Sequence, residues 1–137
     1  MKYLLATILI SSGLTSGLAP VSAFSAEMNP FESYSKAYKL CMDKAVSTQD
    51  IVECTDIEYR VQDKRLNVAY KNLVGKQTPA RVKQLTEVQK LWIKYRDANC
   101  AFYYDPDGGS MARILANDCM LTMTKDRAAE FENMLKN

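Results

Sequence analysis

The chain has 137 residues, of which 47% are apolar and 25% are charged, a size and composition typical of one folded domain. Eighteen Lys and Arg residues against sixteen Asp and Glu residues give a net charge of +2, which is too small to attract nucleic acid or an anionic membrane strongly. The sequence contains no His, which excludes a His-based catalytic triad or a His general base.

The N-terminus has the three regions of a secretory signal peptide. Lys2 is a short basic region, residues 3–14 are mostly apolar, and Val21-Ser22-Ala23 fits the small-x-small cleavage pattern. We expect cleavage after Ala23, with Ala26 as the alternative. An uncut membrane anchor is disfavoured because the apolar segment is shorter than the ~20 residues that a spanning helix needs. The sequence therefore predicts a periplasmic or secreted single domain, residues 24–137, with no membrane span after cleavage.

Two helices are predicted in the first part of this domain. Asn29-Pro30 gives the cap-then-proline signal of a helix start, and the first helix is expected to extend to about Val46. Ser47-Thr48 then caps a second helix over residues 49–74, and Gly75 is a typical residue to follow its end.

Two further helices are predicted in the remainder. Thr78-Pro79 repeats the cap-then-proline signal, and a third helix follows to about Tyr103. Pro and Gly residues in segment 105–109 end it, and Ser110 is expected to cap a fourth helix that extends to about Leu135. No segment alternates apolar and polar residues as a strand does. Because short connections favour antiparallel neighbours, the expected fold is all-α, a small antiparallel bundle of about four helices.

Apolar residues recur at intervals of three, four, seven and eleven positions along the second and third helices, which places them on one face of each helix. They are Tyr59, Leu66, Tyr70 and Leu73 in the second helix, and Val82, Leu85, Trp92 and Tyr103 in the third. We interpret these faces as core rather than as ligand platforms, because an amphipathic helix must bury its apolar face.

Four cysteines follow the predicted signal peptide, an even number that indicates two disulfides in a short exported chain. Three connectivities are possible. We predict Cys41–Cys54 and Cys100–Cys119, because each pair joins one helix to the next across a turn, and a Cys41–Cys119 bond is a less local alternative. Zinc binding is excluded by the spacing, since no two cysteines are two to four residues apart.

Four polar residues interrupt the apolar faces of the second and third helices: Asp63, Asn67, Gln89 and Arg96. Because buried polar groups need partners, we expect them to form one cluster. If the two helices fold back on each other as a hairpin, Glu58 lies level with Arg96. We interpret the cluster as a hydrogen-bonded network that fixes the helix register, in preference to an acid–base site.

Other ingredients of catalysis are missing from the sequence. Cysteine nucleophiles are absent if all four cysteines are oxidised. Asp105 and Asp107 are close, but on a predicted turn and not in the open cleft where a retaining glycosidase holds two carboxylates. Gly108-Gly109-Ser110 resembles a phosphate-binding loop only weakly, because the sequence lacks the GxxxxGK[ST] pattern. We therefore expect no catalytic residues, no metal site and no cofactor.

A longer pattern resembles a known family. It consists of Cys41, Cys54, Asp63-x-x-Leu66-Asn67-x-x-Tyr70-x-x-Leu73, Gln89-x-x-Trp92-x-x-x-Arg96-Asp97-x-x-Cys100, Gly108-Gly109-Ser110, Cys119, Thr122 and Arg127. This combination resembles the N-terminal domain of the LprI-like lysozyme-inhibitor family of exported bacterial proteins over residues 41–135. The resemblance implies a non-enzymatic protein whose partner is lysozyme, although the lipid-anchor cysteine of the family prototype is missing here.

Inhibition of lysozyme would require a rigid convex feature that fills the cleft of the enzyme. The candidate is the connection between the third and fourth helices, with the contact residues Tyr103, Tyr104, Asp105, Asp107, Gly108, Gly109 and Ser110. Its aromatic rings would stack on the cleft walls, and Ser110 and the glycine amides would bond to the catalytic carboxylates. The alternatives are an ordinary helix connector, an envelope immunity or interaction protein with another partner and, less favoured, an enzyme acting on cell-wall glycans.

Overall fold

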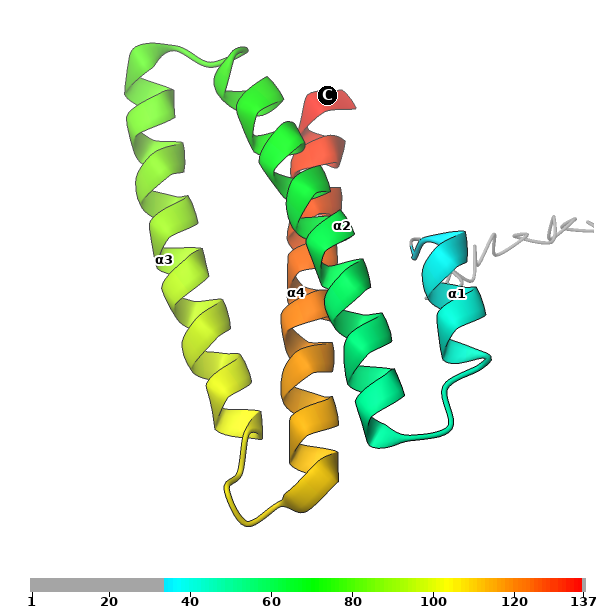
Figure 1. The fold of residues 1–137 in the computed structure, drawn as a ribbon. Coiled ribbons are helices and arrows are strands. Elements are labelled where there is room, and N and C mark those ends of the chain that lie inside the picture. The colour runs from blue at the N-terminus through cyan, green and yellow to red at the C-terminus, as the bar shows by residue number, and fades with distance from the viewer. Residues whose placement is uncertain (1–33, 137) are drawn as a thin grey trace, which may run out of the picture.

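The computed structural model describes residues 34–136, which fold into four helices (Figure 1). In chain order these are α1 (Lys36–Met42), α2 (Thr48–Val74), α3 (Pro79–Tyr103) and α4 (Gly109–Lys136). The predicted signal peptide and the predicted helix start at Asn29-Pro30 lie outside the described residues. The expected all-α fold with four helices is confirmed, and within residues 34–136 no helix is both long and apolar enough to span a bilayer.

The first helix is shorter than the sequence analysis predicted. Ser35 is its N-cap, with Oγ accepting a hydrogen bond of 3.0 Å from a backbone amide of the first turn, and the helix ends before Val46. The carboxylate of Glu58 in α2 accepts hydrogen bonds from both the backbone N–H, at 3.0 Å, and the hydroxyl of Ser35. Together with the Cys41–Cys54 disulfide, these bonds attach α1 to α2.

The second and third helices begin and end close to the predicted positions. Ser47 and Asp50 form a capping box at the start of α2, with each side chain accepting a bond from the backbone N–H of the other residue at 3.1 and 2.9 Å. Pro79 begins α3 after Thr78, which occupies the cap position without a side-chain hydrogen bond. Local sequence signals therefore set the ends of these two long helices.

The packing of the helices differs from a simple hairpin of α2 and α3. Helix α4 packs most extensively against α2 and also against α3, while α1 lies on α2. Helices α2 and α4 run in the same direction and α3 runs in the opposite one (Figure 1). The predicted pairing of α2 with α3 is wrong over most of their length, since α4 takes that place. Near their connection, Tyr70 and Thr86 share a hydrogen bond of 3.2 Å.

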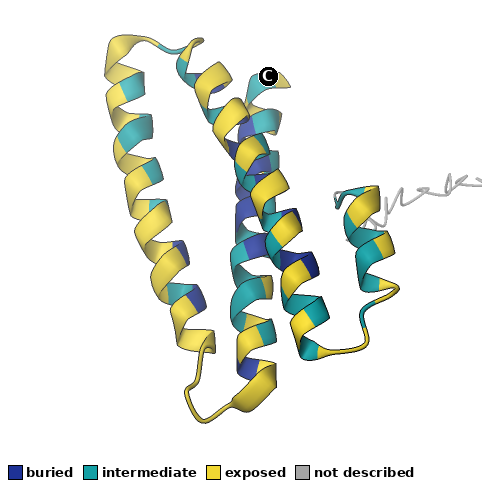
Figure 2. Cartoon of the chain, viewed as in Figure 1, coloured by how far each residue is buried: buried dark blue, intermediate teal, exposed yellow. Residues whose placement is uncertain are grey.

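The core lies between α2 and α4. Its buried apolar cluster consists of Leu66, Ala69, Leu73, Ala128 and Phe131, with Tyr70, Leu85, Trp92 and Leu135 packed against it. Figure 2 shows that most buried positions lie on these two helices, whereas α3 has only two, Arg96 and Cys100. Helix α3 is therefore held less by apolar burial than by the side-chain contacts of a few residues.

An ion pair on the surface also joins α2 to α4. The guanidinium of Arg65 donates to both carboxylate oxygens of Glu132, with an Nε–Oε1 distance of 2.6 Å. The hydrogen bond from Arg65 lowers the pKa of Glu132, and the same bond raises the pKa of Arg65. The charged forms of both side chains are stabilised by this contact.

Candidate functional site

The connection between α3 and α4 projects from the end of the molecule opposite the C-terminus (Figure 1). We call residues 103–111 the α3–α4 loop, since they include the last residue of α3 and the first turn of α4. Its aromatic residues are solvent-accessible, with exposed fractions of 45% for Tyr103 and 56% for Tyr104, and Met111 is 59% exposed. The loop thus presents apolar surface that nothing within residues 34–136 covers.

Two hydrogen bonds fix the turn at the tip of this loop. The Asp105 side chain accepts from the backbone N–H of Asp107 at 2.9 Å, and the Asp105 carbonyl accepts from the N–H of Gly108 at 3.0 Å. A Cβ atom at Gly108 would lie 2.8 Å from Cβ of Ala112, so a larger residue would force the turn to shift. Asp105 and Gly108 therefore shape the loop, which leaves Asp107 as the acidic residue best suited to contact a partner.

The start of α4 differs from the prediction that Ser110 is its cap. The helix begins at Gly109, whose φ of +60° favours glycine, and the Gly108 carbonyl accepts from Ala112 N at 3.4 Å. Ser110 lies inside the first turn. The backbone amides of this turn have no acceptor within the helix, and with the helix dipole they favour a negatively charged group such as a carboxylate.

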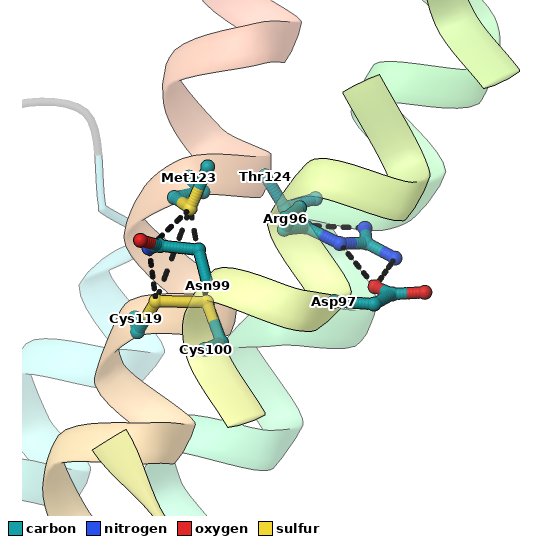
Figure 3. The surroundings of a disulfide bond; sticks show 7 residues. All are labelled: Arg96, Asp97, Asn99, Cys100, Cys119, Met123 and Thr124. Carbon is teal, nitrogen blue, oxygen red and sulfur yellow. Dashed lines mark hydrogen bonds and ion pairs between the residues drawn. A yellow bond between two sulfur atoms is a disulfide. The ribbon is translucent and has the colours of Figure 1, made fainter. Parts of the chain in front are cut away.

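The base of the loop is closed by the Cys100–Cys119 disulfide, with Cα atoms 5.4 Å apart (Figure 3). Cys100 is only 2% exposed, and the Met123 sulfur lies 3.7 and 3.8 Å from the two disulfide sulfurs. Asn99 Nδ2 lies 3.4 Å from the Cys119 sulfur on the same side. Both predicted disulfides are confirmed, and this one fixes the two stems of the loop relative to each other.

Above the disulfide, Arg96 joins α3 to α4 (Figure 3). Its side chain donates to Thr124 Oγ1 of α4 at 3.2 Å and to the carboxylate of Asp97 at 2.8 and 2.9 Å. The guanidinium carbon lies 5.1 Å from the centre of the Trp92 ring, and Arg96 is only 7% exposed. This buried cation is therefore satisfied by an aromatic ring, a hydroxyl and a carboxylate.

The four predicted polar residues do not form one cluster. Asn67, which is exposed, donates to the Asp63 carboxylate at 2.9 Å within α2. Gln89 accepts instead from Arg127 of α4 at 3.0 Å. The expected contact of Arg96 with Glu58 is also wrong, because Glu58 binds Ser35 and Gln62. The reason is topological: α4, and not α2, supplies the partners of Gln89 and Arg96.

Arg127 is the polar residue whose role the sequence analysis missed. It is 6% exposed, and its guanidinium carbon lies 5.6 Å from the Trp92 ring centre and 4.3 Å from that of Phe131. It also donates to Glu130 at 2.6 Å. Arg127 is part of the family-like residue pattern. Its position between the rings of Trp92 and Phe131 could not be predicted, because it depends on the packing of α3 against α4.

A groove of about 460 Å³ lies near the α2–α3 connection, far from the α3–α4 loop. Among its described lining residues Glu130 is the single carboxylate, and it is paired with Arg127. Within residues 34–136 no three His, Cys, Asp or Glu side chains are placed to hold a metal ion. The loop, with exposed rings and a disulfide at its base, is therefore the best candidate for a functional site.

Comparisons with known proteins match most of the chain. A family model described as "Lysozyme inhibitor LprI" matches residues 41–131, which include both disulfides and the α3–α4 loop. An uncharacterized protein of Rhizobium meliloti (strain 1021) is 30% identical over 107 residues, covering 68% of this chain and 77% of that protein. No solved structure matches the chain. The family match over more than half of the sequence means that the chain belongs to the LprI lysozyme-inhibitor family.

Proposed function

We propose that this chain is an exported inhibitor of a lysozyme and that it acts by placing the α3–α4 loop in the catalytic cleft. Family membership supports the activity. The observation that carries the choice of surface is the loop itself, which combines exposed Tyr103 and Tyr104 with the Cys100–Cys119 bond at its base. A loop that is ordered before binding loses less conformational entropy when it binds.

The chemistry of the loop matches that of a glycan-cleaving cleft. Such a cleft holds two catalytic carboxylates between walls that bind sugar rings. Tyr104 offers a flat apolar ring with a polar edge, as a sugar does, and aromatic residues of this type often dominate binding energy. The free amides of the first turn of α4, at Gly109 and Ser110, would donate hydrogen bonds to one of the carboxylates. Asp107 is expected to bind a donor at the rim, because its charge disfavours contact with the carboxylates.

The test is the rate of cell-wall hydrolysis by lysozymes of several classes, with and without the purified, disulfide-bonded protein. We expect inhibition of at least one class. The double variant Tyr104→Ala/Asp107→Ala should weaken it tenfold or more, equivalent to about 1.4 kcal/mol. Its stability should change by no more than about 0.5 kcal/mol, because both side chains lie on the exposed loop.

A matched control removes an apolar side chain from the exposed surface of α2 and an acidic one from that of α4. Val68→Ala/Asp126→Ala makes the same change in charge away from the α3–α4 loop and should leave inhibition unchanged. Equal inhibition by the parent and the loop variant would move the contact surface elsewhere. No inhibition of any lysozyme class would contradict the activity itself and favour a different envelope partner.

A further inference from the structure

Helix α3 carries a second apolar stripe that the predicted core did not include. We call it the outer stripe, and it consists of Val88, Leu91, Tyr95, Ala98 and Phe102. Its members follow one another at intervals of three, four, three and four residues, the spacing of a coiled-coil seam. The large side chains are well exposed, with fractions of 50% for Val88, 65% for Leu91, 61% for Tyr95 and 86% for Phe102.

The outer stripe lies beside the face of α3 that packs on α4. With about 100° of rotation per residue, the outer stripe is turned by roughly a quarter of a circle from the face that contains Gln89, Trp92 and Arg96. That inner face is partly polar, whereas the outer stripe is wholly apolar. Among residues 34–136, the main neighbour of α3 is α4, which covers only the inner face. A helix that is apolar on two adjacent faces is expected to have two neighbours.

We infer that the outer stripe is the interface between two copies of this chain, which pair through α3 in antiparallel orientation. The same stripe on both copies gives the self-complementary contact that a twofold dimer requires. Since a buried aromatic ring covers 150–250 Å², the outer stripe would bury roughly 500 Å² per copy. The total of about 1,000 Å² reaches the size at which specific interfaces begin.

The groove near the α2–α3 connection can hold the ring of Phe102, the most exposed residue of the outer stripe. Val88 of the outer stripe is also one of its lining residues, together with Gln84, Leu85 and Phe131. In an antiparallel pair in which Leu91 of each copy packs on Tyr95 of the other, Phe102 comes level with Gln84. The Phe102 ring of each copy would then enter the groove of the other, whose volume of about 460 Å³ can hold it.

The first experiment measures the mass of the disulfide-bonded chain by sedimentation between about 1 and 100 µM. We expect a dimer whose dissociation constant rises at least tenfold in Leu91→Glu and in Phe102→Ser. Leu91→Gln is a second variant without the added charge, and circular dichroism verifies that each variant is folded. Ile57→Glu is the matched control, because Ile57 is 58% exposed on α2 and should not affect the dimer.

The second experiment locates the contact. Isotope-labelled and unlabelled copies are mixed and treated with a carbodiimide, which joins carboxylates to amines without a spacer. We expect cross-links that join the α3 helix of a labelled copy to the α3 helix of an unlabelled one. A chain that stays monomeric over the whole range, or a dimer that survives Leu91→Glu, would overturn the inference. So would loss of lysozyme inhibition in Leu91→Glu without any dimer in the parent, since the stripe would then bind the enzyme.

Discussion

Arg96 provides a sharp test of what holds α3 on α4. Arg96→Ala removes a hydrogen bond from a charged donor to buried Thr124, a loss of about 1.5–3 kcal/mol. It also removes a buried cation–π contact with Trp92, a loss of about 1–2 kcal/mol. The ion pair with Asp97 adds little, because the side chain of Asp97 is 53% exposed. Since these contributions overlap, we expect unfolding free energy to fall by about 3 kcal/mol.

Asp63→Ala is the matched comparison for this substitution. Asp63 is half-buried, and its carboxylate bonds to Asn67 of the same helix, so its loss should cost less than about 1 kcal/mol. Urea unfolding of the disulfide-bonded chain, followed by circular dichroism, measures both values. In a thermal melt, the loss expected for Arg96→Ala corresponds to a decrease in Tm of about 12 °C or more. Arg96→Lys should fall between parent and Arg96→Ala, because Lys keeps the charge but not the planar group.

Two results would refute this reasoning. Equal losses in Asp63→Ala and Arg96→Ala would indicate that both residues belong to a single network, as in a closed hairpin of α2 and α3. A loss below about 1 kcal/mol in Arg96→Ala would mean that apolar contacts alone hold α3 in place.

Three further predictions follow from the other contacts. Replacing Cys100 and Cys119 with Ser should lower the unfolding free energy by about 3 kcal/mol in urea unfolding, because the disulfide closes a loop between cysteines 19 positions apart. The same replacement should weaken inhibition in the lysozyme assay. The ion pair with Arg65 lowers the pKa of Glu132 in the folded chain, so it stabilises the fold fully at pH values above the usual Glu pKa of about 4.3. This stabilisation is lost as the pH falls through the lowered pKa of Glu132 in the folded chain. Unfolding as a function of pH should show that loss in the parent and not in Glu132→Gln. Intact mass of the exported protein should correspond to a start at Phe24, with Glu27 as the alternative, and a mass that retains residues 1–23 would contradict the signal peptide.

The parts of the fold that the sequence predicted well depend on neighbouring residues. The capping box of Ser47 with Asp50 and the proline at position 79 act within one turn, so their effect can be recognised without the tertiary structure. The same holds for the two disulfides, each of which links consecutive helices. The start of α1 was harder, because Ser35 is one of several possible caps and gains a further partner, Glu58, from α2.

The partners of the polar residues could not be predicted because they depend on which helices are neighbours in space. The short connection between α2 and α3 favoured a hairpin, but α4 packs on both helices, and α2 and α3 contact each other only near that connection. Arg96 and Gln89 therefore meet Thr124 and Arg127 of α4. Of the predicted loop residues, Tyr104, Asp105, Asp107 and Gly108 lie in the connection, whereas Gly109 and Ser110 belong to α4. The roles of Asp105 and Gly108 in shaping the turn depend on contacts that the sequence alone does not reveal.

The order of the disulfides has a consequence for biogenesis. Each bond joins cysteines that are consecutive in the chain, Cys41 with Cys54 and Cys100 with Cys119. A chain that crosses the membrane N-terminus first presents both members of the first pair to an oxidase before either member of the second pair has emerged. Loop closure favours the same short-range pairs, because ordering a short segment costs less entropy. Folding after the proposed export should therefore require a thiol oxidase but little help from a disulfide isomerase.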